Sequence, residues 1–275
     1  MDNQPLVSIV TPVYNGSQFL EEMIESAREQ TYPNIEHVII DDGSTDGGKS
    51  VAILKKYPHL RWWSRPNIGQ YATQNELFRE AKGVWVTANG QDDRYHDKYA
   101  IERIVDHARK HPDADVIHGI THIIDEEGEH FPFQYPQKFP YWTLQYSLNI
   151  RHCSLFAKTE LMLKHDLFFN ESLKYTGDAD WIFRLQLAGL KFSRVNKYVS
   201  DYRHHPEQLT TIANRNPVAW AARDAEDKRL QTLYGPNPLI RKLVMSWVNF
   251  EKRKRVASLL LKGYRRSDNG WIKQR

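Results

Sequence analysis

The stretch Val7–Gly48 reads "VSIVTPVYNGSQFLEEMIESAREQTYPNIEHVIIDDGSTDGG" and decides the fold. Its first residues are rich in β-branched side chains, which predicts a buried strand that stops at Pro12. The segment Phe19–Ala27 then carries apolar residues at helical spacing, with Ser17 as the expected cap. "IEHVII" predicts a second buried strand, and the turn "DDGSTDGG" follows it. The order of strand, helix and strand is typical of a parallel βαβ unit.

This alternation continues to about residue 110. "LRWWS" (60–64) and "VWVTA" (84–88) are strand candidates, and helices are expected near 49–56, 70–82 and 95–111. The pattern predicts an α/β fold with a doubly wound, mostly parallel sheet flanked by helices. Beyond Asp115 the alternation weakens: a strand or hairpin is expected at 115–125, Pro- and aromatic-rich loops at 126–142, and a helix from about 176. Asn216–Tyr234 and Leu239–Lys262 predict a C-terminal helical extension.

The composition is that of an ordinary globular protein, with 275 residues, 40% hydrophobic and 26% charged. The single cysteine, Cys153, excludes an internal disulfide framework and a cysteine-built zinc site, and it fits a reducing, cytoplasmic compartment. The first residues lack the basic and apolar regions of a signal peptide. No run approaches the roughly 20 apolar residues that span a bilayer.

Charge is distributed unevenly along the chain. Leu239–Arg275 contains 11 Lys/Arg and 2 Asp/Glu, a net charge of +9, so the remainder carries −5 within the total of +4. The basic segment predicts either an interfacial helix that contacts anionic lipid or a helix docked on the α/β domain with a solvated basic face. Nucleic-acid binding is disfavoured, because the body is acidic and no recognised module is present.

Three polar segments follow predicted parallel strands: "TPVYNG", "DDGSTDGG" and "NGQDD". Ligands of open α/β sheets bind beyond the carboxyl ends of the strands, so these segments are expected to meet in one cleft. The adjacent carboxylates Asp92 and Asp93 need a positive partner if they form a site. The alternative is that "NGQDD" is only a polar turn.

These residues together resemble the family 2 glycosyltransferases, which have the GT-A fold and include bacterial enzymes that build cell-surface polysaccharides. The resemblance extends from Val7 to about Thr211 and is most specific in the opening stretch. "NIGQYATQN" resembles the family's N-x-G-x…N segment, and "NGQDD" stands at its DXD-type motif. "GDADWIFRL" resembles the stretch "EDxDLWLR" that carries the base, and "YRHHPEQLT" resembles the C-terminal histidine segment.

The resemblance implies a donor site built on these motifs. Asp93 would ligate a divalent metal, Mn²⁺ or Mg²⁺, which stabilises a leaving diphosphate, and Asp92 would face the donor ribose. Gln91 stands where a strict D-x-D has its first carboxylate, a departure from the pattern. Asp42 would accept a hydrogen bond from the imide N–H of uracil or thymine, although it and Asp41 are also suited to cap the following turn.

Three further residues belong to the implied donor site. Pro12 and Tyr14 would line the base pocket, and the alternative for Tyr14 is ordinary packing. Gly69 would allow the backbone to approach the donor, and the alternative is a turn before a helix.

The resemblance also implies that Asp178 is the general base. It would accept the proton of the acceptor hydroxyl during in-line attack on the anomeric carbon. Asp180 lies two positions on, about 200° around a helix, so both carboxylates cannot face one cleft. Gly177 replaces the acidic residue that precedes the base in the family. His205, rather than His204, matches a histidine that contacts the metal or diphosphate, and Arg203 is a second cation for the diphosphate.

The sequence thus predicts a GT-A domain at residues 1–215, with a nucleotide-binding half to about 112 and an acceptor half from 113, and a basic helical extension at 216–275. The activity that the resemblance implies is inverting, metal-dependent transfer of a sugar from a nucleoside-diphosphate donor, UDP- or dTDP-linked, to a glycan or lipid-linked acceptor. The predicted location is the cytoplasm or the inner membrane face. The alternative is a catalytically degenerate protein of the same fold. A nucleotidyltransferase and a dehydrogenase are disfavoured, because no glycine-rich phosphate loop or G-x-G-x-x-G follows the first strand.

Overall fold

A computed structural model describes residues 4–131, 140–144, 146, 148, 150–235 and 237–262, and the backbone alone of 264–267 and 270–273. The chain forms two compact units. Unit 1 comprises Met1–Thr121 and Ile150–Tyr202, and unit 2 comprises His122–Asn149 and Arg203–Arg275. The predicted loops at residues 132–139 lie outside the described residues. The predicted domain boundary at residue 215 stays a prediction.

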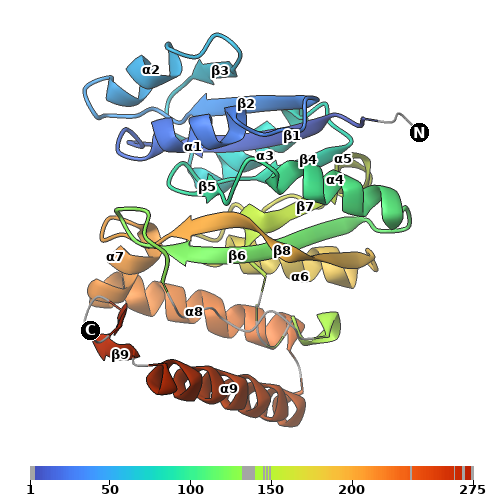
Figure 1. Cartoon of the computed structure of the whole chain (residues 1–275), viewed down its shortest axis with the longest axis vertical. Coiled ribbons are helices and arrows are strands. Elements are labelled where there is room, and N and C mark those ends of the chain that lie inside the picture. The colour runs from blue at the N-terminus through green and yellow to red at the C-terminus, as the bar shows by residue number, and fades with distance from the viewer. Residues whose placement is uncertain are drawn as a thin grey trace. The chain divides into compact units, whose positions relative to one another are not determined.

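One mixed sheet of eight strands organises the fold, in the order β3-β2-β1-β4-β7-β6-β8-β5 (Figure 1). Its strands are β1 (Val7–Val13), β2 (Ile35–Asp41), β3 (Arg61–Ser64), β4 (Trp85–Ala88), β5 (Arg94–Tyr95), β6 (Val116–Ile124), β7 (Leu155–Lys158) and β8 (Phe192–Arg203). The first four strands are parallel, as predicted. The pairs β4–β7, β6–β7 and β5–β8 are antiparallel.

The strand order reverses between β1 and β4. The chain moves outward from β1 through β2 to β3 and returns to the other side of β1 as β4. Right-handed crossovers therefore place α1 (Leu20–Arg28) and α2 (Lys49–Leu54) on one face and α3 (Gln70–Glu80) on the other. A reversal of this kind opens a crevice at the carboxyl ends of the two strands, which is where such sheets bind ligands.

Apolar side chains fill both faces of the sheet in unit 1. On one face α1 and α4 (Ala100–Lys110) pack against alternate strand residues, with Met23, Ile104 and Phe156 fully buried. On the other face Phe78 of α3 contacts Trp181 of α6 (Gly177–Leu187), with ring centroids 5.4 Å apart. The predicted α/β class and GT-A-type layering are confirmed.

Two local predictions were wrong. The first strand does not stop at Pro12 but continues to Val13, and Pro12 pairs with Ile40 of β2. Proline is tolerated there because the β1–β4 pairing ends at Val10, so in the part of the chain that the structure describes no strand pairs with Pro12 on that side of β1. Ser17 does not cap α1, because that helix begins at Leu20 without a side-chain cap.

The C-terminal helices of unit 2 are α7 (Leu209–Arg215), α8 (Pro217–Tyr234) and α9 (Pro238–Leu261), followed by the antiparallel pair of β9 (Tyr264–Ser267) and β10 (Gly270–Lys273). The sequence predicts α8 and α9 at these positions, but it does not predict α7. Asn216 and Asn237 cap α8 and α9 by accepting backbone N–H groups, and a proline follows each as the first helical residue. Among the described residues, none of the helices is both long and apolar enough to cross a membrane.

Candidate active site

One glutamine bridges the chain segments that follow β1 and β4. Gln91, which follows β4, accepts a hydrogen bond from Tyr14 N at 2.8 Å and donates one to Tyr14 O at 3.0 Å. The side-chain amide therefore pairs with the backbone after β1 as a strand would. This arrangement explains Gln91 at the first position of the DXD-type motif: a carboxylate accepts but cannot donate.

Gly16 makes room for this bridge, because a Cβ there would lie 2.3 Å from Gln91 Oε1. Gly90 makes room for the next side chain, because a Cβ there would lie 2.6 Å from Asp92 Oδ1. The loop after β1 is also tied to the loop after β2, because Asn15 N donates to Ser44 Oγ at 2.9 Å and Thr45 N donates to Asn15 Oδ1 at 2.7 Å. The structure thus brings the three polar segments together at the strand ends. Tyr14 itself is 46% exposed, so its ring is free of the core.

Asp42 is a buried carboxylate whose position is fixed by the loop that follows β3. Its Oδ1 accepts hydrogen bonds from the Arg65 guanidinium and from Ile68 N at 3.0 Å, and its Oδ2 accepts one from Gly69 N at 3.1 Å. A carboxylate oxygen has two acceptor positions. Within the described residues, Oδ1 therefore uses both positions, whereas Oδ2 keeps one. Asp41 shows the capping alternative, because its Oδ1 is 3.4 Å from Ser44 N.

Gly69 lies at the start of α3 with φ of +97°, a conformation that favours glycine, and an added Cβ would meet no atom within 4 Å. The open space beside this backbone agrees with a close approach by a ligand. Arg65 is held in turn by Glu76 at 2.9 Å and Thr73 at 2.9 Å. The donor-side loop is therefore a network of charged hydrogen bonds rather than a free turn.

The end of β4 gathers oxygen ligands. Asp93 is 2% exposed, and Asn89, which precedes it, is 1% exposed. Neither the Oδ1 nor the Nδ2 of Asn89 has a hydrogen-bond partner within the described residues. Carboxylate and amide oxygens are ligands that suit a hard cation such as Mg²⁺ or Mn²⁺, and Asp93 and Asn89 offer one of each within four residues of the chain. Sequence reasoning missed Asn89, because an asparagine beside a glycine looks like a turn.

Asp178 lies in the first turn of α6, and His152 lies beside it on the short helical turn His152–Ser154. His152 Nδ1 is 3.6 Å from Asp178 Oδ2, an ion-pair distance. Burial alone would raise the pKa of Asp178, but the interaction with His152 and the charge of Arg151 outweigh it, so the pKa is lowered. Burial alone would lower the pKa of His152, yet Asp178 and, less strongly, Asp93 raise it. Asp178 is thus kept ionised, as a general base requires. Sequence reasoning missed His152 because it has no metal-ligand spacing.

Asp180 has a structural role, as its helical position predicts. It is 2% exposed, and Arg184 Nε donates to its Oδ2 at 2.8 Å. Gly177 is also explained: a Cβ there would lie 2.5 Å from the ring of Tyr71. The departure from the family's acidic residue therefore has a steric cause in this chain.

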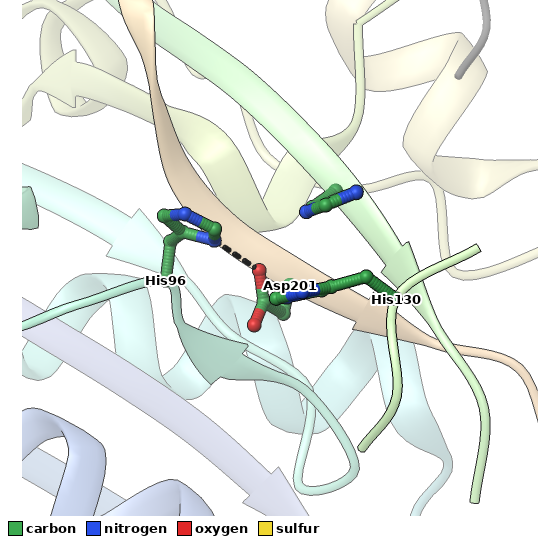
Figure 2. A group of neighbouring side chains, drawn as sticks. His96, His130 and Asp201 are labelled. Carbon is green, nitrogen blue, oxygen red and sulfur yellow. Dashed lines mark hydrogen bonds and ion pairs between the residues drawn. The ribbon is translucent and has the colours of Figure 1, made fainter. Parts of the chain in front are cut away.

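The segment after Asp93 is anchored by a buried carboxylate on β8. Arg94 Nε donates a hydrogen bond to Asp201 Oδ2 at 2.9 Å. His96 Nδ1 lies 2.6 Å from the other carboxylate oxygen, Asp201 Oδ1, and Figure 2 shows the His96 ring directed at it. Arg94 also bonds Glu22 of α1. Asp93 is thus followed directly by an ion-pair network that fixes the backbone.

Four predicted site residues remain to be placed: two in unit 1 and two in unit 2. Pro12 is half-buried in β1, and Asp92 is half-buried beside Gly90. Arg203 and His205 belong to unit 2, where Arg203 Nη1 donates to Asp125 O at 3.0 Å and Glu126 O at 2.9 Å. Arg203 therefore holds a loop of its own unit. His205 as a metal ligand stays a prediction.

Comparison with known proteins identifies the family. The model of "Glycosyl transferase family 2" matches residues 8–162, more than half of the chain. The chain belongs to this family, which confirms the resemblance seen in the sequence.

Similar proteins occur in several bacteria. A Rickettsia felis glycosyltransferase is 33% identical over 233 residues, 79% of this chain and 38% of the relative. A Rickettsia typhi glycosyltransferase is 33% identical over 223 residues, 76% of this chain and 67% of the relative. The chondroitin synthase of Escherichia coli is 30% identical over 213 residues, 75% of this chain and 30% of the synthase. The chain thus spans well under half the length of some of the relatives it matches.

Solved structures share the fold. S. aureus TarS 1-349 in complex with UDP-GlcNAc has a TM-score of 0.62 at 22% identity, covering 74% of this chain and 60% of TarS. The mannosyltransferase PcManGT of Pyrobaculum calidifontis, in complex with GDP-Man and Mn²⁺, has a TM-score of 0.62 at 17% identity, covering 95% of this chain and 77% of PcManGT.

Proposed function

We propose that this chain is an inverting, metal-dependent glycosyltransferase. It takes a sugar from a nucleoside-diphosphate donor and transfers it to a hydroxyl group of a glycan or lipid-linked acceptor. The observation that carries the proposal is the Asp178 carboxylate 3.6 Å from His152 Nδ1, an arrangement that lowers the pKa of Asp178, in the unit that also contains Asp93 and Asp42. A base for the acceptor and a metal ligand for the leaving group are the two parts that direct displacement requires.

The acceptor position left on Asp42 Oδ2 favours UDP or dTDP as the nucleotide. Uracil and thymine present one imide N–H, which one remaining position satisfies. Guanine presents an N–H and an adjacent amino group to a carboxylate, and the bonds from Arg65 and Ile68 already fill Oδ1. TarS binds UDP-GlcNAc, which agrees with this preference, whereas PcManGT binds GDP-Man.

The residues fit a divalent cation. Asp93 would ligate Mn²⁺ or Mg²⁺, and the Asn89 amide, which has no hydrogen-bond partner among the described residues, is close to it in sequence. The bound metal would neutralise the negative charge that develops on the diphosphate as it leaves. Asp92 would orient the donor ribose, while Pro12, Tyr14 and Gly69 would hold the nucleotide.

Asp178 would then act on the acceptor. Its carboxylate accepts the proton of the attacking hydroxyl as the oxygen bonds to the anomeric carbon, and the bond from that carbon to the diphosphate breaks on the opposite face. A single displacement of this kind inverts the configuration. The lowered pKa of Asp178 keeps the base ionised near neutral pH.

The basic helix α9 would bring the enzyme to a lipid-linked acceptor at the cytoplasmic face of the inner membrane. Leu239, Leu243, Phe250 and Leu261 are between 58% and 89% exposed and recur on one side of α9, with Lys254 over the Phe250 ring at 5.4 Å. Apolar side chains beside cations suit an anionic membrane surface. Co-sedimentation with phosphatidylglycerol vesicles, but not with phosphatidylcholine vesicles, is expected; equal recovery with and without vesicles would refute this contact.

Thermal shift with nucleotides tests the donor proposal. We expect UDP or dTDP to raise the melting temperature in the presence of Mn²⁺ or Mg²⁺, and EDTA to abolish the shift, because a ligand that binds only the folded state stabilises it. GDP, CDP and ADP serve as controls. Absence of any shift would favour the catalytically degenerate alternative.

A second measurement separates binding from catalysis. We expect Asp178→Asn to keep the UDP shift and to lower sugar transfer by about 10²-fold or more, since general base catalysis contributes that much. Unchanged transfer would show that another group is the base.

A further inference from the structure

Tyr71 joins the donor-side loop to the start of α6. It is the second residue of α3 and is 8% exposed. Its hydroxyl oxygen accepts a hydrogen bond from Gly177 N at 3.0 Å. The side chain of the N-cap residue, Thr176, makes no cap bond. Tyr71 therefore satisfies one of the backbone N–H groups that a helix leaves unpaired at its N-terminus.

The same ring occupies the space in front of Gly177. A Cβ on Gly177 would lie 2.5 Å from Tyr71 Cε2 and Cζ and 2.9 Å from Cδ2. Gly177 does not have the positive φ that favours glycine. The requirement for glycine at this position therefore comes from the packing of Tyr71.

Helix α3 also clamps the chain that leads into α6. The Asn75 amide donates to Phe169 O at 2.9 Å and accepts from Phe169 N at 2.7 Å. The Phe169 ring stacks on Tyr71 with centroids 5.2 Å apart and on Trp181 of α6 at 4.9 Å. Tyr71 and Asn75 are four residues apart, so they lie on one face of α3. The paired amide of Asn75 and the stacked rings thus restrict movement of this face of α3 relative to α6.

We propose that Tyr71 is a positioning residue for the Asp178 carboxylate, and that its hydrogen bond to Gly177 N fixes the first turn of α6. The inference rests on the proposed function only in naming Asp178 as the base. Because Tyr71 is two residues from Gly69, the same side chain links the loop expected to hold the donor to the residue that deprotonates the acceptor.

Tyr71→Phe tests the hydrogen bond while keeping the ring. Hydrogen exchange of the peptide spanning Gly177–Phe183 is expected to quicken roughly fivefold or more, as loss of one hydrogen bond implies. The matched control is Tyr32→Phe, which removes the bond of another buried tyrosine hydroxyl to Pro5 O at the amino end of β1. The control should leave the α6 peptide unchanged. Equal exchange in Tyr71→Phe and wild type would overturn the inference, whatever the activity of the enzyme.

Turnover distinguishes positioning from a merely structural role. UDP release from UDP-GlcNAc with Mn²⁺ is expected to show kcat reduced about tenfold or more in Tyr71→Phe, because a small misplacement of a catalytic group is costly, while KM for the donor changes little. The Tyr32→Phe control should match wild type in kcat. An unchanged kcat in Tyr71→Phe would refute the link to the base. If wild type binds neither UDP nor dTDP and releases no UDP, the proposed function fails, and the exchange experiment still decides the role of Tyr71.

A substitution at the other partner tests the packing. Gly177→Ala should lower the melting temperature in the wild-type background and have little effect in a Tyr71→Ala background, where the space is empty. Equal losses in both backgrounds would show that Tyr71 is not what requires glycine at this position.

Discussion

Gln91→Glu separates two interpretations of the DXD-type position. On the sequence pattern, a carboxylate at 91 restores the missing acidic residue and should strengthen metal-dependent nucleotide binding. On the structure, the same change breaks the bridge between β1 and β4 and should weaken binding. The two interpretations predict opposite signs for one substitution.

The magnitude follows from the two bonds. Gln91 Oε1 accepts from Tyr14 N, and a glutamate keeps that bond. Gln91 Nε2 donates to Tyr14 O at 3.0 Å, and a glutamate would place a carboxylate oxygen against that carbonyl instead. Loss of one hydrogen bond and the unfavourable contact together cost about 1–2 kcal/mol. The Kd for UDP should therefore rise roughly 5- to 30-fold, at about 1.4 kcal/mol per factor of ten.

Isothermal titration with UDP and Mn²⁺ measures this change. Gln18→Glu is the matched control, because Gln18 is an exposed glutamine of the same β1–α1 connection and receives the same charge. It should bind UDP as wild type does. Tighter UDP binding by Gln91→Glu would refute the structural argument and support the carboxylate as a metal ligand.

The other predictions concern the buried residues that support the site. Burial would raise the pKa of Asp201, but His96 and Arg94 outweigh it, so the pKa is lowered in the folded protein. The Asp201 carboxylate therefore stabilises the fold at pH values above the ordinary carboxyl pKa, and this stabilisation is lost as pH falls through the lower pKa of the folded state. Asp201→Asn should therefore destabilise by about 3 kcal/mol at pH 7 and by less in acid, measured by urea unfolding at both pH values; an equal loss in acid would contradict it. Trp181→Ala should destabilise by about 3–5 kcal/mol, because its fully buried ring leaves a cavity, and a loss below 1 kcal/mol would refute that packing. His152→Gln should move the acid limb of the pH profile of kcat/KM for UDP release to higher pH, since it removes the cation that lowers the pKa of Asp178. An acid limb at the same pH as in wild type would show that His152 does not set the pKa of Asp178.

The sequence was sufficient for the elements whose signals are local. Apolar periodicity predicted the strands and helices of the parallel half, and the position of polar segments after strands predicted that they converge. The roles of Gln91, Tyr71 and His152 were not predictable in this way. Each contacts a residue between 26 and 106 positions away in the chain. Such contacts depend on the strand order, which no local pattern specifies.

The errors have physical causes of the same kind. A proline in a strand pattern predicts that the strand ends there. Pro12 destabilises β1 only if a neighbouring strand needs its missing N–H group, and this depends on where the pairing with β4 ends. Ser17 is a good capping residue in isolation, but the chain continues for two more residues before α1 begins. Gly177 looked like the loss of an acidic neighbour, whereas it is the space that an aromatic ring requires.

Asp42 enters the proposed site already immobilised. The Arg65 guanidinium and two backbone amides hold its carboxylate before any nucleotide arrives. A base that binds there would not have to order the carboxylate, so little conformational entropy is lost on the protein side. Discrimination between bases would then be a property of the resting protein rather than of a closing motion, and a uridine nucleotide methylated at N3 would be rejected at the first encounter for want of one hydrogen.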